Sequence, residues 1–290
     1  MNIACRLARQ FFPQGACALL LYAACVMNVM AAQIELPSLS EPASAEHHVG
    51  KVIWADLVTP DLAGAKQFYS GLFGWTYRDI HGGDRDYAVA LLDGRPVAGL
   101  LQRVIAPGEH RQPAWLTFIA VPDVDAARQT ALEHGGKVVF EPKTFPQRGR
   151  QAVFKDPEGA VFAVLASTSG DPPDYLAAPG EWIWSSLLAR DPDTDAAFYQ
   201  ALFGYDVFEL SSDDGLEHAV LSTDGYARAS VNTLPTDKSP RHPHWLNFVR
   251  VLDAAEMIVE REKAMAEVLH QGKPISQVMG ANYEHMLKKL

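Results

Sequence analysis

The sequence is poor in cysteine, and the three cysteines that it has lie close to its start. Cys5, Cys17 and Cys25 all precede residue 33, so the rest of the 290-residue chain has none. A segment without cysteine forms no disulfide, offers no thiolate nucleophile and holds no zinc through sulfur. Positive charge is also scarce, with 25 Lys and Arg against 35 Asp and Glu and a formal net charge of −10. This balance argues against a nucleic-acid partner, which needs clustered basic residues.

Long hydrophobic runs are scarce as well, and the one near the N-terminus is short. Ala16–Ala24 follows two arginines and precedes small residues that suit a signal-peptide cleavage site. This layout predicts a signal peptide over residues 1–32 and a periplasmic or secreted protein that leaves the membrane after cleavage. An uncleaved anchor and a lipoprotein signal ending at Cys25 are the alternatives. The Pro, Ser, Ala and Glu content of residues 33–48 predicts a flexible linker.

A long internal repeat runs through the rest of the chain. Its most telling part is FYSGLFGW, which recurs as FYQALFGY, and every matched residue lies 130 positions beyond its counterpart. One register held across so many aromatic positions indicates a duplication. The matched segments are 54–61 with 184–191, 68–75 with 198–205, and Trp115 with Trp245.

Each copy contains shorter units with one order of elements. An apolar strand ends at an Asp that can cap a helix, the helix ends at Gly, and further strands follow. In the first unit, Ala65, Phe68, Tyr69 and Leu72 form one apolar stripe of a helix, and Asp93-Gly94 marks a hairpin turn. The pattern predicts an α+β protein built from βαβββ modules.

The order of these motifs is specific enough to suggest a family. A Pro-Asp turn after the first strand, then FYSGLFGW, then a hairpin, then Asp156-Pro-Glu-Gly159 before a last apolar strand, resembles the vicinal-oxygen-chelate (glyoxalase, bleomycin-resistance and dioxygenase) superfamily. The resemblance is closest to its tandem two-domain members. It implies that residues 49–170 form one half-open eight-stranded barrel from two βαβββ modules, with the ligand on the concave face.

The second copy follows this pattern only in part. Residues 180–253 contain one module and the first strand of the next, and residues 254–290 then read as a divergent helical tail without the three closing strands. Either unrelated sequence has replaced those strands, or the tail covers the sheet edge that they leave. Because domains of this type often pair their modules between chains, a homodimer is a further expectation.

The positions at which the superfamily holds its metal carry apolar residues here. The resemblance puts these ligands seven residues before each turn Asp and four residues after the Gly of the DPEG turn. No side chain at these positions binds a divalent metal, so no cofactor is expected. A metal site remains a weaker alternative, with His218 and His244 of the second copy as its candidates. The five positions hold Trp54, Leu116, Trp184, Leu246 and Ala163.

The remaining candidates for a binding site are aromatic. Trp54, Tyr87 and Trp184 are the candidate ligand-binding residues, because aromatic walls with few polar groups suit an apolar or planar molecule. The alternative is that they belong to the hydrophobic core. The sequence thus predicts an exported protein that binds a small apolar or aromatic molecule without a metal. Two other hypotheses are a metal-dependent lyase or dioxygenase-like enzyme, and a degenerate copy that binds no ligand.

Overall fold

The computed structural model describes residues 34–82, 85–104, 113–211, 217–235 and 242–253. The chain divides into two compact units, residues 1–33 and 34–290, and every described residue belongs to the second. The expected signal peptide and the expected helical tail lie outside the described residues. Within the described ranges, no helix is both long enough and apolar enough to cross a membrane.

The first copy consists of two βαβββ modules, as predicted. The Asp93-Gly94 turn joins two of its strands with positive φ at both residues, 50° and 78°, as a tight hairpin requires. The first module contains β1 (Val52–Thr59), α2 (Leu62–Phe73), β2 (Thr76–Gly82), β3 (Arg85–Leu92) and β4 (Arg95–Gln102). The second contains β5 (Ala114–Ala120), α3 (Val124–Glu133), β6 (Lys137–Phe145), β7 (Gly149–Lys155) and β8 (Val161–Ser167).

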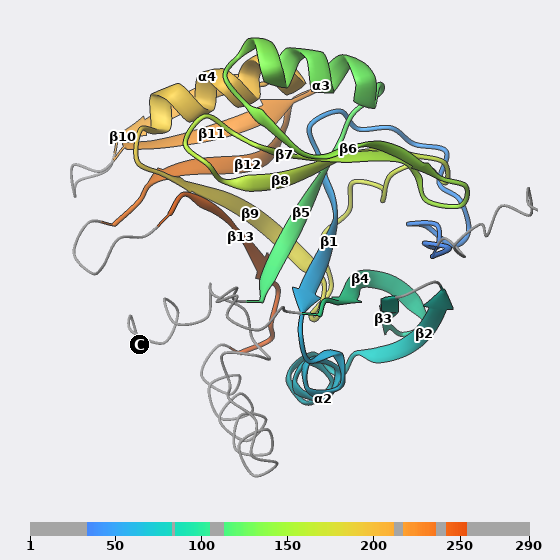
Figure 1. Ribbon diagram of the computed structural model, residues 1–290. Helices are drawn as coiled ribbons and strands as arrows, with labels where there is room; N and C mark the ends of the chain where they lie inside the picture. Colours follow the sequence, from blue (N-terminus) through green and yellow to red (C-terminus); the bar gives the residue numbers. More distant parts are fainter. Residues whose placement is uncertain (1–33, 83–84, 105–112, 212–216, 236–241, 254–290) are drawn as a thin grey trace, which may run out of the picture. The chain divides into compact units, whose positions relative to one another are not determined.

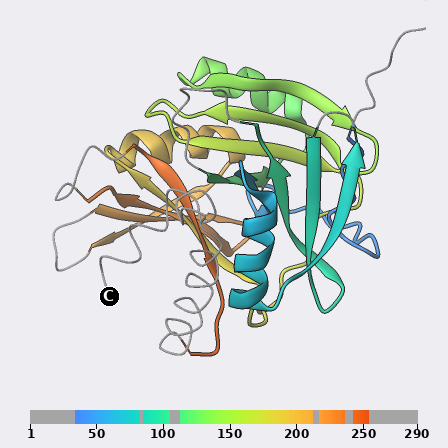
Figure 2. The same ribbon diagram turned by 60° about the horizontal axis from the view of Figure 1, so that its bottom comes forward.

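These eight strands form one mixed sheet in the order β2-β3-β4-β1-β5-β8-β7-β6. The first strands of the two modules, β1 and β5, are antiparallel neighbours, and each pairs in parallel with the last strand of its own module. Side chains from β1, β3, β5 and β8 meet in one core cluster, so the sheet curves around a concave face (Figures 1 and 2). This confirms the predicted half-open barrel.

The described part of the second copy repeats one module and begins another. Its five-stranded sheet has the order β10-β11-β12-β9-β13, and β13 pairs with β9 as β5 pairs with β1. The elements are β9 (Trp182–Ala189), α4 (Pro192–Phe203), β10 (Asp206–Ser211), β11 (Glu217–Thr223), β12 (Tyr226–Thr233) and β13 (His244–Val249).

Short polar motifs set the ends of the helices. Asp61, Asp123 and Asp191 each accept hydrogen bonds from backbone amides of the first helical turn, which satisfies donors that the helix leaves unpaired. Gly74 and Gly204 end α2 and α4 with φ of 70° and 71°, a conformation that favours glycine. The Asp caps therefore form as predicted in all three helices and the Gly ends form in α2 and α4, whereas α3 ends at His134.

The two copies share a core on the side of α3 and α4, which lie side by side (Figure 1). The DPEG turn of the first copy takes part in this contact. Asp156 accepts hydrogen bonds from the amides of Gly159 and Ala160 through one oxygen, at 2.7 and 2.8 Å. Its other oxygen accepts one from the Tyr199 hydroxyl of α4, at 3.0 Å. The Asp156 carboxylate thus stabilises the turn and also the contact between the two copies.

Equivalent residues of the two copies make reciprocal contacts. Trp75 Nε1 donates a hydrogen bond to the Gly180 carbonyl at 3.0 Å, and the equivalent Tyr205 hydroxyl donates to the equivalent carbonyl, that of Gly50. Thr117 and its own counterpart Asn247 touch each other, with Asn247 Nδ2 3.0 Å from Thr117 Oγ1. Such reciprocity indicates that a pseudo-two-fold axis relates the copies.

The segment before the first strand packs against the first sheet. We expected a flexible linker over 33–48, but Leu36 and Leu39 are only 7% and 2% exposed and belong to the core cluster of the concave face. Ser169 Oγ accepts hydrogen bonds from the amides of Leu39 and Ser40. The composition suggested mobility, but Leu36 and Leu39, with Ile34 packed beside them, anchor the start of the segment in the core.

Asp195 of α4 is buried at the same contact between the copies without a compensating donor. Its side chain is fully buried, and neither carboxylate oxygen accepts a hydrogen bond from a described group. Burial raises its pKa to about 8, and the negative charges of Asp156 and Glu158 contribute to that rise. The folded protein therefore holds a proton here that the unfolded chain releases near pH 4.

This linkage predicts a pH-dependent stability. The contribution of Asp195 is fully present below pH 4 and is lost as the pH rises to about 8, at about 1.4 kcal/mol per pH unit. Asp195→Asn removes the titration, so its unfolding free energy should exceed that of the wild type increasingly from pH 5 to 8. Urea unfolding at several pH values measures this, with Asp193→Asn on the exposed side of α4 as the control. Identical pH profiles for wild type and Asp195→Asn would contradict the assignment.

Candidate functional site

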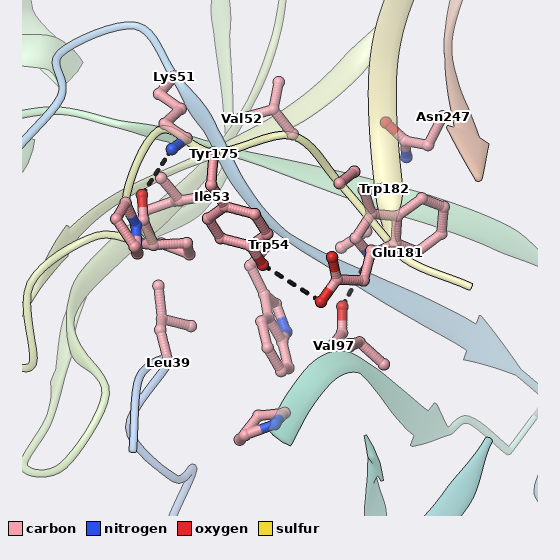
Figure 3. Close-up of a pocket in the computed structure, with 15 residues that line it drawn as sticks. Leu39, Lys51, Val52, Ile53, Trp54, Val97, Tyr175, Glu181, Trp182 and Asn247 are labelled. Atoms are coloured by element: carbon pink, nitrogen blue, oxygen red, sulfur yellow. Dashed lines mark hydrogen bonds between the residues drawn. The ribbon is translucent and has the colours of Figure 1, made fainter. Parts of the chain in front are cut away.

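A pocket of about 140 Å³ lies where β1 and β4 begin (Figure 3). Its walls come from residues 51–55 of the first copy, from Pro96 and Val97, from the connection between the copies, and from Asn247 on β13. An apolar cavity of similar volume holds a molecule the size of benzene. The pocket therefore suits one small ring and is shared by both copies.

Two indole rings, those of Trp54 and Trp182, line the pocket together with Tyr175, and hydrogen bonds fix both indoles. Trp54 Nε1 donates to Asp56 Oδ1 at 2.7 Å, and Trp182 Nε1 donates to the Val97 carbonyl at 2.7 Å. Trp182 also packs edge-on against Trp115, with ring centroids 5.2 Å apart. Because their donors are already used, the rings offer a ligand apolar surface in fixed positions.

The charged groups of the pocket, Lys51 and Glu181, each have a partner of opposite charge just outside its lining. Lys51 Nζ lies 2.8 Å from Asp174 Oδ1, and burial lowers the pKa of its ammonium while Asp174 opposes that shift. Glu181 accepts hydrogen bonds from the Tyr175 hydroxyl and the Ala178 amide, and it lies 2.8 Å from Arg95 Nη2 (Figure 3). These charges neutralise each other, so the pocket favours an uncharged molecule.

A buried polar network lies behind Trp54 on the concave face. Asp56 Oδ1 accepts hydrogen bonds from both Trp54 Nε1 and the Tyr87 hydroxyl, each at 2.7 Å. Arg148 Nη2 donates to the same hydroxyl at 3.0 Å, and its guanidinium carbon lies 4.7 Å from the centroid of the Trp54 ring. Burial raises the pKa of Asp56, and the positive charge of Arg148 with the two hydrogen bonds opposes that rise.

The network depends on a glycine in the neighbouring strand. Gly99 pairs with Asp56 across β4 and β1. A Cβ atom at position 99 would overlap both the Asp56 carboxylate and the Tyr87 hydroxyl. Glycine is needed here because of this close approach and not because of its backbone angles.

The second copy carries a neutral version of this network. Trp184 Nε1 donates to Ser230 Oγ at 3.1 Å, Ser186 Oγ lies 2.7 Å from the same oxygen, and Asn232 links it to His218. By strand register Ser186 replaces Asp56, and His218 replaces Tyr87. The face of the second sheet that carries Trp184 is also more exposed than the matching face of the first sheet. Three apolar side chains on it are substantially exposed. They are Phe208, Leu210 and Phe248, at 56%, 53% and 41%.

The structure brings the predicted aromatic residues together only in part. Trp54 lines the pocket, whereas Tyr87 does not line it and is linked to Trp54 through Asp56 and Arg148. Trp184 lies on the separate sheet of the second copy. The three candidates therefore do not form one site. Trp182, which completes the pocket, was absent from the prediction.

The two candidate histidines lie too far apart to share an ion. His218 pairs with Asn232, which pairs with Leu188, which pairs with His244. Three inter-strand spacings separate the histidines, about 14 Å. The structure therefore does not bring them into one site, because residues on one face of a sheet still lie apart when two strands intervene.

The metal positions that the family resemblance implies do not fit a metal ion. Trp54 presents an indole N–H that can only donate, and Leu116 and Ala163 offer no donor atom. Among the described residues, no group of three His, Cys, Asp or Glu side chains is placed to hold a metal. The chemistry of these side chains argues against a family-type metal site in the first copy.

Sequence reasoning missed the charged members of the buried network. Asp56 stands in an otherwise apolar strand, VIWADLVT, and a carboxylate in such a strand signals a buried partner. Arg148 gave no comparable signal, because it lies in a turn where an arginine is ordinarily exposed.

Comparisons with known proteins agree with this geometry. Residues 46–164 match the family model described as “Glyoxalase/Bleomycin resistance protein/Dioxygenase superfamily”. The Mycobacterium tuberculosis protein named “Putative glyoxylase CFP32” is 31% identical over 240 residues, which cover 82% of this chain and 91% of that protein. The Streptomyces “Anthracycline biosynthesis protein DauV” is 32% identical over 216 residues, 70% of this chain and 78% of that protein.

Solved structures with a similar fold have much lower sequence identity. The Mn(II)-bound glyoxalase from Novosphingobium aromaticivorans has a TM-score of 0.50 at 17% identity, over 75% of this chain and 70% of that one. A single-residue variant of homoprotocatechuate 2,3-dioxygenase from B. fuscum has a TM-score of 0.51 at 15% identity, over 80% of this chain and 64% of that one. These likenesses concern the fold alone. From its curated relatives and its own modules, the chain belongs to the glyoxalase/bleomycin resistance protein/dioxygenase superfamily.

Proposed function

We propose that this protein is an exported member of the superfamily that binds a small apolar or aromatic molecule without a metal ion. The observation that carries the proposal is the pocket between Trp54 and Trp182, whose indole donors and charged neighbours are all paired within the protein. A wall of this kind recognises shape and apolar surface. A relative named for anthracycline biosynthesis is consistent with an aromatic ligand class.

The proposal of export rests on the first 32 residues of the sequence. N-terminal sequencing of protein recovered from the periplasm or the medium should read from Ala32 or Gln33. A membrane-bound chain that retains its first residues would instead support an uncleaved anchor.

Filling the pocket should abolish ligand binding. Ala177 lines the pocket and the adjacent Ala178 does not, so Ala177→Leu occupies the cavity and Ala178→Leu is its matched control. We expect toluene, phenol or indole to raise the Tm of the wild type and of Ala178→Leu. At one hundred times Kd, the gain in stability is about 2.7 kcal/mol. Ala177→Leu should lose this shift. Equal shifts for the two variants would place the ligand elsewhere.

The relatives named for glyoxylase activity favour a second function, a metal-dependent lyase or dioxygenase-like enzyme of the same superfamily. The metal content of the purified protein distinguishes these two functions. We expect purified protein to hold well below one equivalent of Zn, Ni, Mn or Fe, because the family positions in the first copy offer no ligand atoms. A stoichiometric, tightly bound metal would overturn the metal-free proposal. Its loss in His218→Ala or in His244→Ala would then locate the site.

A further inference from the structure

The contact between the copies is covered more completely on the α4 side than on the α2 side. Phe203 of α4 and Trp245 of β13 are only 4% and 2% exposed. Their counterparts in the first copy, Phe73 of α2 and Trp115 of β5, are half-buried. The residue types match, so the difference comes from what packs against them. The α2 surface, as this apolar patch is named here, consists of Tyr69, Leu72, Phe73 and Trp115.

The closing part of the first copy provides the cover on α4. Helix α3 packs against α4, and the Phe162 ring of β8 lies edge-on to three aromatic rings of α4, with centroids 5.1 to 6.4 Å apart. Among the described elements, no helix packs against α2 in this way, and no strand follows β13 as β8 follows β5. Figure 1 shows α2 apart from α3 and α4. The pseudo-two-fold relation therefore leaves a place beside α2 that no described element takes.

A hydrogen bond also distinguishes the two sides. Trp115 Nε1 donates to the Tyr69 hydroxyl, and the equivalent Trp245 Nε1 donates to the Tyr199 hydroxyl, each at 3.0 Å. The Tyr199 hydroxyl then donates to Asp156 of the first copy. The Tyr69 side chain is only 6% exposed, yet its hydroxyl donates to no described acceptor. Because a buried hydroxyl ordinarily uses its proton, the α2 surface lacks an acceptor that a docked chain would supply.

The segment that follows β13 starts where α3 starts in the first copy. Asp253 is the counterpart of Asp123, which caps α3, and Ala254 is the counterpart of Val124, the first residue of α3. A helix over 254–269 would be about 24 Å long, against about 18 Å for the 12 residues of α2. The segment is therefore long enough to cover α2 from end to end.

The sequence of residues 254–269 is amphipathic at helical spacing. Arg261 falls within the apolar side, where its aliphatic stem can lie along an apolar surface while its charge reaches water. A sequence of this kind buries one side against a neighbour. The apolar side consists of Ala254, Met257, Ile258, Met265, Val268 and Leu269, and the opposite side of Glu256, Glu260, Lys263 and Glu267.

We propose that residues 254–290 dock on the α2 surface of the same chain, through the apolar side of 254–269, in the place that α3 and β8 take on α4. The segment shields Phe73 and Trp115, and one of its oxygens accepts the hydrogen bond from Tyr69. Its attachment to β13 favours it over a second copy of the chain, because a tethered partner has a high effective concentration. Trp115 also packs against Trp182 of the pocket wall, so the docked segment supports the pocket from behind.

Hydroxyl-radical labelling of the full chain, read by peptide mass spectrometry, tests this docking. Ile258→Asp puts a charge on the apolar side, whereas Val259→Asp puts the same charge on the other side and is the matched control. Labelling of Phe73 and Trp115 should rise about tenfold in Ile258→Asp, because the docked state loses a buried apolar side chain. Val259→Asp should label like the wild type. Equal labelling in all three proteins would overturn the docking.

Phe73→Ser tests the same contact from the α2 side, and it also decides the matter if Ile258→Asp fails to fold. Hydrogen exchange at the Ile258 and Met265 amides should become about tenfold faster in this variant. Phe208→Ser, at an exposed phenylalanine of the second copy, is the control and should leave this exchange unchanged. Light scattering completes the test. If the wild type is a dimer, and dilution to monomers exposes Phe73 and Trp115 to labelling, then a second copy covers the α2 surface and the proposal is wrong.

Discussion

The structure depends on the reciprocal hydrogen bonds through which each copy holds the backbone of the other. Trp75 binds the Gly180 carbonyl and Tyr205 binds that of Gly50, and both donors follow directly after the helix of their module. The first bond holds the end of the connection against the first module, and the second holds the residue two positions before β1 against the second copy. The pocket lies between the parts that these bonds join, since neither copy supplies all of its walls. Duplication therefore produced a cavity that a single domain would lack.

The two concave faces show how one scaffold supports different chemistry. In the first copy, Asp56 and Arg148 are buried in a charged network, which Gly99 leaves room for. In the second copy, Ser186 and Ser230 occupy the places of Asp56 and Gly99, and the network is neutral and more exposed. Both faces carry tryptophan where the superfamily resemblance implies a metal ligand. Membership in the family thus fixes the architecture and leaves the chemistry to individual side chains.

Much of the fold could be predicted because its signals are local. The helix-capping aspartates and the Asp93-Gly94 turn act over a few residues, and the structure contains them where they were expected. The site was less predictable. Trp54 lines the pocket as the sequence suggested, but its partner Trp182 comes from the other copy and no spacing rule connects them. Arg148 was missed because it lies in a turn, and because one of its partners, the Pro37 carbonyl, belongs to a segment that composition suggested would be flexible.

The sequence by itself determined the repeat, the modules and the absence of metal-binding side chains at the family positions, because these follow from residue type and spacing. The tertiary structure alone decided which residues meet. Strand register separates His218 from His244 by three spacings, although both lie on one face. Burial brings Arg148 against Trp54, although the two lie far apart in the chain. Contacts between distant segments depend on how the sheets curve and pack, and the periodicity of the sequence does not predict this packing.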